Sequence, residues 1–282
     1  MPAQLHVDET GEGPPLVALH GFGASTYTWR HVLGALAESH HVYAVDLKGS
    51  GRSPKPRDGR YSMRDQAALV LDLIAERNLA GLTLVGHSFG GGVALITALE
   101  LLRTRPRTLA SLILFASPAY RQRLPTFIRA LRVPVLGPLV QRITPVSLQV
   151  RTVLRLAYHD DALVPEEAVA AYAAPLGLPG GREALRATAC QIVPPDIDAL
   201  AACYPLIDVP TLLIWGRHDR IVPLDVGERL HRAIAGSRLL VVDQAGHVPH
   251  EETPERVRPA LRELLAPSLP SPLPSSQTSS RR

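Results

Sequence analysis

One serine in the sequence has neighbours that can turn its hydroxyl into a nucleophile. Ser88 is the centre of the pentapeptide Gly86-His87-Ser88-Phe89-Gly90. The apolar run 82–85 before it predicts a strand, and the apolar pattern 89–102 after it predicts a helix. A glycine two residues to either side allows a sharp strand-to-helix turn, which places the serine hydroxyl at the edge of a sheet. This context predicts a nucleophile at Ser88.

A nucleophilic serine needs a base, and the base needs an acid that orients it. Asp219 follows the apolar run 211–215, and His247 follows the run 238–242. The carboxyl ends of parallel strands lie at one edge of a sheet, so the loops that hold Ser88, Asp219 and His247 can converge there. We predict that these three residues form a catalytic triad. Asp208 and Asp225 are the alternatives for the acid.

Such a triad requires strands that end together, and the hydrophobic pattern predicts them. Short apolar runs predict strands at residues 16–19, 42–45, 82–85, 111–115, 211–215 and 238–242. Periodic apolar positions predict helices between them, at residues 63–77, 89–102, 224–234 and 254–265. This alternation is typical of an α/β fold, with a mostly parallel central sheet flanked by helices.

The alternation breaks in the middle of the chain. Residues 118–205 are rich in proline and helical in pattern, and they contain no convincing strand. We interpret them as an inserted helical cap over the carboxyl edge of the sheet. The core is then expected at residues 1–117 and 206–265. Residues 266–282 are rich in proline and serine without apolar periodicity, and we predict that they are disordered.

The composition limits the classes of function. The chain has 282 residues, 46% of them hydrophobic and 20% charged, which excludes disorder of the whole chain. Its 30 basic and 26 acidic residues leave a net charge of +4. A nucleic-acid-binding protein is usually more basic, so no nucleic-acid partner is expected.

Neither a metal site nor a cofactor motif is recognisable. His250 and Glu251 are adjacent, but the spacing of a metalloprotease is missing. Gly49-Ser50-Gly51 lacks the third glycine of a dinucleotide-binding loop. We therefore expect no metal and no cofactor.

The sequence also carries no sign of export. It has only two cysteines, no apolar leader at residues 1–12, and no run of about 18 apolar residues that could span a membrane. We expect a cytoplasmic location without a transmembrane segment.

One stretch has an unusual charge balance. Residues 101–159 contain ten arginines and no aspartate or glutamate, and most of these arginines belong to the predicted cap. Arg129 and Arg132 are three residues apart, on one helical face. The simplest interpretation is a cap helix whose arginines point into water. The alternatives are attraction of a carboxylate-bearing substrate, admission of a lipid-like acyl chain, and peripheral docking on an anionic membrane, which is not favoured.

Together the motifs resemble the α/β-hydrolase fold superfamily, in the branch with a serine nucleophile and a cap domain. The resemblance covers nearly all of the chain outside the cap and the tail, on residues 20–23, 46–53, 86–90, 216–223 and 246–247. It implies an oxyanion hole made by the backbone N–H groups of Phe22 and Phe89. His20, His87 and Asp46 lie beside the motifs, and we expect structural roles for them, with Asp46 fixing the turn 49–53.

The resemblance implies a serine hydrolase that cleaves a small-molecule carboxylic ester of apolar or acyl-chain character through an acyl-serine. A serine nucleophile argues against the haloalkane dehalogenase and epoxide hydrolase branches, which use aspartate. Three alternatives stay open: a carbon–carbon bond hydrolase of ring-fission diketones, a cofactor-free haloperoxidase or perhydrolase, and a non-catalytic binding protein. Gly23-Ala24-Ser25, where ring-fission hydrolases usually have Gly-Pro-Gly, disfavours the first of them. The substrate and the oligomeric state are left open.

Overall fold

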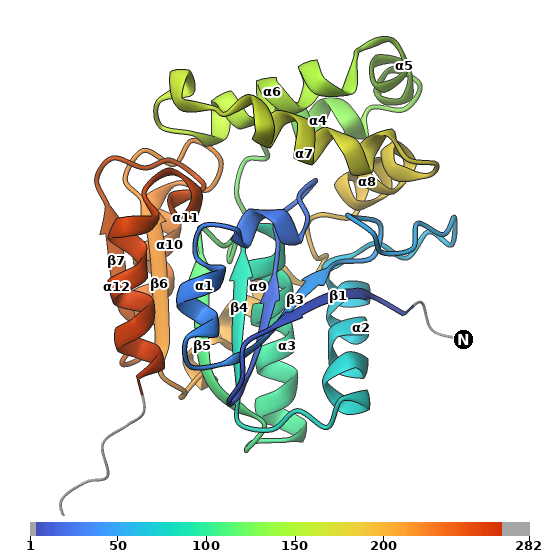
Figure 1. The fold of residues 1–282 in the computed structure, drawn as a ribbon. Coiled ribbons are helices and arrows are strands. Elements are labelled where there is room, and N and C mark those ends of the chain that lie inside the picture. The colour runs from blue at the N-terminus through green and yellow to red at the C-terminus, as the bar shows by residue number, and fades with distance from the viewer. Residues whose placement is uncertain (1–3, 267–282) are drawn as a thin grey trace, which may run out of the picture.

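A seven-stranded sheet forms the centre of the molecule. In the computed structural model, which describes residues 4–266, the strands have the order β1-β3-β2-β4-β5-β6-β7 (Figure 1). Strands β2 to β7 run parallel, and β1 pairs antiparallel with β3. Their bounds are β1 His6–Thr10, β2 Pro15–Leu19, β3 His41–Asp46, β4 Leu82–His87, β5 Leu109–Phe115, β6 Thr211–Gly216 and β7 Arg238–Val242.

The predicted α/β-hydrolase fold with its mostly parallel sheet is confirmed. Each of the six predicted strands corresponds to one of β2 to β7. Strand β1 was not predicted, because its sequence His-Val-Asp-Glu-Thr has one apolar side chain and no buried residue. As an edge strand it needs no continuous apolar run.

Helices cover both faces of the sheet. On one face α2 (Met63–Glu76), α3 (Phe89–Thr104) and α10 (Leu224–Ala233) pack against strand residues such as Val17 and Leu84. On the other face α1 (Leu33–Ala37) and α12 (Pro254–Leu265) pack against Leu16 and Ile113. The two helical layers cover strands β2 to β6, which is why these strands are apolar on both sides, whereas the edge strand β7 is only partly buried.

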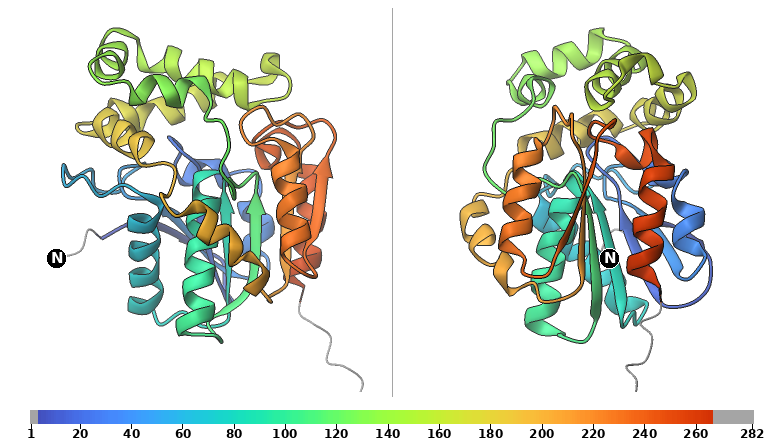
Figure 2. Two further views of the ribbon diagram at one scale, coloured as in Figure 1. Left: turned by 180° about the vertical axis from the view of Figure 1, so that it is seen from behind. Right: turned by 90° about the vertical axis from the view of Figure 1, so that its left-hand side faces the viewer.

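Residues between β5 and β6 form a separate helical layer. The helices are α4 Thr126–Arg132, α5 Leu136–Ile143, α6 Val146–Ala157, α7 Glu166–Gly177, α8 Gly181–Cys190 and α9 Ile197–Ala202, and residues 118–205 contain no strand. Helices α4 to α8 lie above the carboxyl ends of the strands, and α5 is at the outer corner of this layer (Figures 1 and 2). We call residues 118–205 the cap. The predicted disordered tail, 266–282, lies outside the described residues except for Ala266.

Candidate active site

Ser88 lies on the turn between β4 and α3. Its backbone has φ 49° and ψ −121°, a conformation that costs energy for any residue except glycine. The turn fits only because its neighbours are small: a Cβ on Gly86 would come within 2.6 Å of the Gly90 carbonyl oxygen, and a Cβ on Gly90 would overlap the Leu19 carbonyl oxygen. The glycines predicted to permit a sharp turn are therefore required by its geometry.

The structure brings Ser88, Asp219 and His247 together. The Ser88 Oγ lies 2.8 Å from His247 Nε2, and His247 Nδ1 lies 2.8 Å from Asp219 Oδ2. Asp219 follows β6 and His247 follows β7, at the same edge of the sheet as Ser88. Asp208 and Asp225 are exposed, and within the described residues neither bonds to His247.

The Asp219 carboxylate is held so that it can orient the imidazole. Its side chain is fully buried, and Oδ1 accepts hydrogen bonds from the N–H groups of Ile221, at 2.8 Å, and Val222, at 2.9 Å. Oδ2 then accepts from His247 Nδ1–H. The proton at Nδ1 leaves a lone pair on Nε2, which faces the Ser88 hydroxyl and can accept its proton.

The loop after β2 packs directly on the nucleophile. A Cβ on Gly21 would lie 3.2 Å from the Ser88 Cβ, which shows how closely the two segments approach. Phe22 is the next residue in this loop, and Phe89 is the first residue of α3. Among the described residues, the N–H groups of Phe22 and Phe89 have no hydrogen-bond acceptor. Both groups can therefore donate to a ligand beside Ser88.

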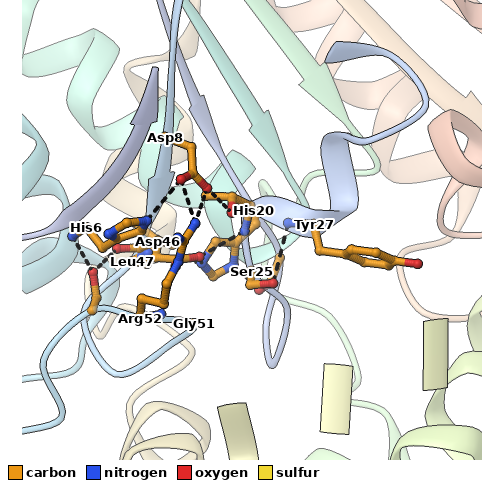
Figure 3. Close-up of polar contacts among 12 residues, drawn as sticks. His6, Asp8, His20, Ser25, Tyr27, Asp46, Leu47, Gly51 and Arg52 are labelled. Carbon is orange, nitrogen blue, oxygen red and sulfur yellow. Dashed lines mark hydrogen bonds and ion pairs between the residues drawn. The ribbon is translucent and has the colours of Figure 1, made fainter. Parts of the chain in front are cut away.

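Buried polar contacts fix the shape of this loop (Figure 3). His20 donates from Nδ1 to the Gly21 carbonyl at 2.8 Å, and its Nε2 accepts from the Leu47 N–H at 3.0 Å. Burial lowers the pKa of His20, although Asp46 opposes the shift, so the ring is neutral as this pattern requires. The Asp46 carboxylate accepts from the N–H groups of Thr26 and Arg52, each at 2.8 Å. Asp46 thus fixes the turn 49–53, as the sequence predicts.

A cavity of about 490 Å³ opens above Ser88, between the core and the cap. Its wall is mainly apolar, and the cap contributes side chains from α4 to α8, among them Phe127, Leu131, Leu154, Leu176 and Leu185. The described residues that line it include no lysine and no arginine. Arg129 and Arg132 are exposed on α4 and are not part of the wall.

Glu251 is a candidate functional residue. The sequence indicates it only as a possible metal ligand next to His250. Its carboxylate is fully buried in the cavity wall and accepts hydrogen bonds from Thr28, at 2.7 Å, from Arg30, at 2.8 Å, and from Tyr158 and Tyr172. Burial raises the pKa of Tyr172 well above its usual range, and Glu251 adds to the shift, so the phenol keeps its proton. Because both tyrosines belong to the cap, Glu251 joins the cap to the core.

The end of α6 is also attached to the loops of the triad. The His247 N–H donates to the Ala157 carbonyl at 2.6 Å, and the His159 N–H donates to Glu252 at 2.6 Å. From the other loop, Arg220 donates to the carbonyl oxygens of Arg155, at 2.8 Å, and Tyr158, at 2.5 Å. The backbone of the histidine loop is therefore held partly by the cap.

His87 and His250 are buried beneath the triad. His87 donates from Nε2 to the His247 carbonyl at 3.0 Å, and His250 Nε2 lies 2.9 Å from Thr28 Oγ1. Burial lowers the pKa of His87 well below the usual range, and repulsion from neighbouring histidines adds to the shift. Burial lowers the pKa of His250 to about 4. His87 thus supports the backbone of His247.

We predict that His250 makes the fold less stable in mild acid. Between its ordinary pKa of 6.5 and its folded value of about 4, the unfolded chain binds a proton that the folded chain does not. The unfolding free energy should therefore fall as the pH is lowered through this window, by about 3 kcal/mol for this residue alone.

Urea denaturation at several pH values, on the wild type and on His250→Gln, measures this loss of unfolding free energy. The variant should lose less stability, whereas His218→Gln, at an exposed position, should behave like the wild type. Equal slopes for His250→Gln and the wild type would contradict the prediction.

Residues 4–266 contain neither a cluster of metal ligands nor a membrane-spanning helix. No three histidine, cysteine, aspartate or glutamate residues are grouped so that they could hold a metal ion. No helix in this part of the chain is long and apolar enough to cross a membrane.

Comparisons with known proteins agree with this architecture. Residues 16–260 match the alpha/beta hydrolase family. The chain is 30% identical over 251 residues to the uncharacterized hydrolase YugF of Bacillus subtilis (strain 168), with 89% of each chain covered. It is 31% identical over 273 residues to the 2-hydroxymuconate semialdehyde hydrolase of Pseudomonas sp. (strain CF600), with 93% of this chain and 90% of that one covered. It superposes on the esterase EaEST of Exiguobacterium antarcticum with a TM-score of 0.78 and 25% identity, with 93% of this chain and 95% of that one covered. The chain therefore belongs to the alpha/beta hydrolase family.

Proposed function

We propose that this protein is a serine hydrolase that cleaves neutral carboxylic esters with an apolar acyl group. The observation that carries the proposal is the hydrogen-bonded chain from Ser88 through His247 to Asp219 at the floor of an apolar cavity. A protein that only binds a ligand has no need of this order and geometry. The esterase among its structural relatives is consistent with the proposal.

The proposed mechanism has two halves. His247 Nε2 takes the proton of Ser88 as Oγ attacks the ester carbonyl carbon, and the N–H groups of Phe22 and Phe89 donate to the oxyanion. The carbon–oxygen bond to the alcohol then breaks, and His247 returns the proton to the leaving oxygen. Water, deprotonated by His247, then attacks the acyl-serine carbonyl carbon. The bond between this carbon and Ser88 Oγ breaks, the acid leaves, and His247 returns the proton to Oγ. Asp219 stabilises the positively charged imidazole in both halves.

The charge of the cavity wall distinguishes between substrate classes. Among the residues described, its lining contains Glu251, His87 and His247, and neither a lysine nor an arginine. The charge of Glu251 is already paired with Arg30, so a substrate with its own carboxylate would lose its hydration there without gaining an ion pair. Neutral esters are favoured for this reason.

Carbon–carbon bond hydrolysis is the second candidate. It is favoured by the 31% identity to the 2-hydroxymuconate semialdehyde hydrolase, over 93% of this chain. The same serine and histidine could serve that reaction, so the triad does not separate the two candidates. The charge of the cavity wall does, because a ring-fission dienoate is an anion.

A panel of p-nitrophenyl esters of increasing acyl length tests the proposal. We expect kcat/KM to rise about fourfold for each methylene that the cavity buries, and to fall once the chain exceeds the cavity. A ring-fission dienoate should be turned over slowly or not at all. Turnover of the dienoate without turnover of any ester would refute the esterase proposal in favour of carbon–carbon hydrolysis.

A further inference from the structure

Helix α5 presents its apolar residues to the outside. Leu139 and Ile143 are four residues apart on one stripe of the helix, and 50% and 69% of their surfaces are exposed. Val135, the residue before the helix, is 81% exposed. The opposite side of the helix contains Gly137 and Gln141, which are both buried. Burying a glutamine while exposing three aliphatic side chains is the reverse of the usual arrangement. An apolar face of this kind marks a contact with something outside the chain.

The packing of the buried side makes this orientation fixed. A Cβ on Gly137 would lie 2.5 Å from the Leu131 carbonyl oxygen, so α5 is seated closely on α4. The Gln141 side chain donates to the carbonyl of Arg182, and Arg182 donates back to the Gln141 carbonyl. These contacts between α5 and α8 prevent the helix from rotating its apolar stripe inward.

The surroundings of the stripe are positively charged. Arg129, Arg132 and Arg142 are exposed on α4 and α5, and none of them forms an ion pair within residues 4–266. No acidic residue occurs between positions 101 and 159. We define the α5 face as Val135, Leu139 and Ile143 together with these three arginines. It occupies the corner of the cap that is farthest from the sheet (Figures 1 and 2).

The active-site cavity reaches the surface beside this face. Val140 on α5 and Leu148 on α6 both line the cavity, and both are exposed, to 36% and 52%. The apolar wall of the cavity therefore includes exposed side chains on α5 and α6.

We propose that the α5 face docks on the surface of an anionic lipid bilayer. The stripe would enter the boundary between headgroups and acyl chains, while the three arginines pair with lipid phosphates. A second copy of the chain fits the face less well, because a symmetric dimer through it would bring two sets of unpaired arginines together. Delivery of an ester from the bilayer into the cavity rests on the proposed hydrolase function, whereas docking itself does not.

Vesicle sedimentation of the full-length protein tests docking. The probes are phosphatidylcholine vesicles and vesicles with 30% phosphatidylglycerol. We expect binding to the anionic vesicles that weakens as salt is added, and much weaker binding to the neutral ones. Arg129→Gln with Arg132→Gln should lower the partition coefficient about 30-fold, at about fivefold per arginine. Leu139→Ser with Ile143→Ser should lower it at least tenfold.

Matched controls separate docking from general effects of charge and of folding. Arg105→Gln with Arg107→Gln removes two exposed arginines outside the cap, and Leu163→Ser removes another exposed leucine. Both control proteins should bind like the wild type. So should Ser88→Ala, which makes the measurement independent of the proposed hydrolase function.

Three results would overturn the proposal. The first is equal binding of the wild type to neutral and anionic vesicles, and the second is unchanged binding of Arg129→Gln with Arg132→Gln. The third is a dimer in sedimentation velocity that Leu139→Ser with Ile143→Ser dissociates, without any vesicle binding by the wild type. That result would assign the α5 face to a second copy of the chain.

Discussion

Replacement of Ser88 by alanine is expected to lower kcat for the best ester by about 10⁴–10⁶-fold. The substitution removes the Oγ that lies 2.8 Å from His247 and leaves the cavity wall unchanged. Binding of the ester, reported by KM, should therefore change far less than kcat. A fluorophosphonate probe should label the wild type and fail to label the variant. Full ester hydrolysis by a clean preparation of Ser88→Ala would show that another group is the nucleophile.

The acid of the triad can be tested by a paired substitution. In Asp219→Asn the side-chain amide would face His247 Nδ1. It would favour the imidazole tautomer that is protonated on Nε2, and in this tautomer Nε2 cannot accept the proton of Ser88. We expect kcat to fall about 10⁴-fold. Asp225→Asn, at the exposed alternative position, should keep nearly full activity. The opposite pattern would assign the acid to Asp225.

The second large effect is expected on stability, at Glu251. Glu251→Leu would leave the Arg30 guanidinium, whose side chain is 19% exposed, without its carboxylate, and would remove the acceptor of Thr28, Tyr158 and Tyr172. Breaking a buried ion pair from one side typically costs about 3–5 kcal/mol of unfolding free energy. Urea denaturation measures this loss.

A surface pair provides the control for Glu251. Glu263 pairs with Arg238, and more than half of each side chain is exposed. Glu263→Gln should cost about 0–1 kcal/mol. Because Tyr158 and Tyr172 attach the cap through Glu251, Glu251→Leu should also speed limited proteolysis within residues 118–205, and Glu263→Gln should not. Similar losses of stability in both variants would contradict the role of the buried network.

Local patterns were sufficient to predict most of the sheet and all three residues that the structure brings together. The strands β2 to β6 are buried between two helical layers, so each one leaves an apolar run in the sequence, and the half-buried β7 leaves one as well. Ser88, Asp219 and His247 each lie within five residues of the end of such a run. Strand β1 left no comparable pattern, because an edge strand needs little burial.

Contacts between distant segments could not be predicted in the same way. Glu251 bonds to Tyr172 and Thr28, which are 79 and 223 residues away, and no spacing in the sequence relates them. The attachment of α6 to the loop of His247 is a hydrogen bond from the His247 N–H to the Ala157 carbonyl, and a bond between backbone groups depends on no particular residue type. The arginines of α4 could be counted, but only the structure places them outside the cavity wall.

The end of α6 is attached to the loops of Asp219 and His247. This attachment limits which parts of the cap can be exchanged to change the substrate specificity. Residues 155–159 contact the loops that hold the His247 imidazole in place, so exchanging these residues should lower the turnover of every substrate. Residues 126–143 line the far side of the cavity and bond to neither loop. Recombining that segment with its counterpart from a relative should change which acyl groups are accepted and leave the proton-transfer geometry intact. Under the proposed function, residues 126–143 can therefore change the substrate preference without disturbing the contacts that hold the loops of Asp219 and His247.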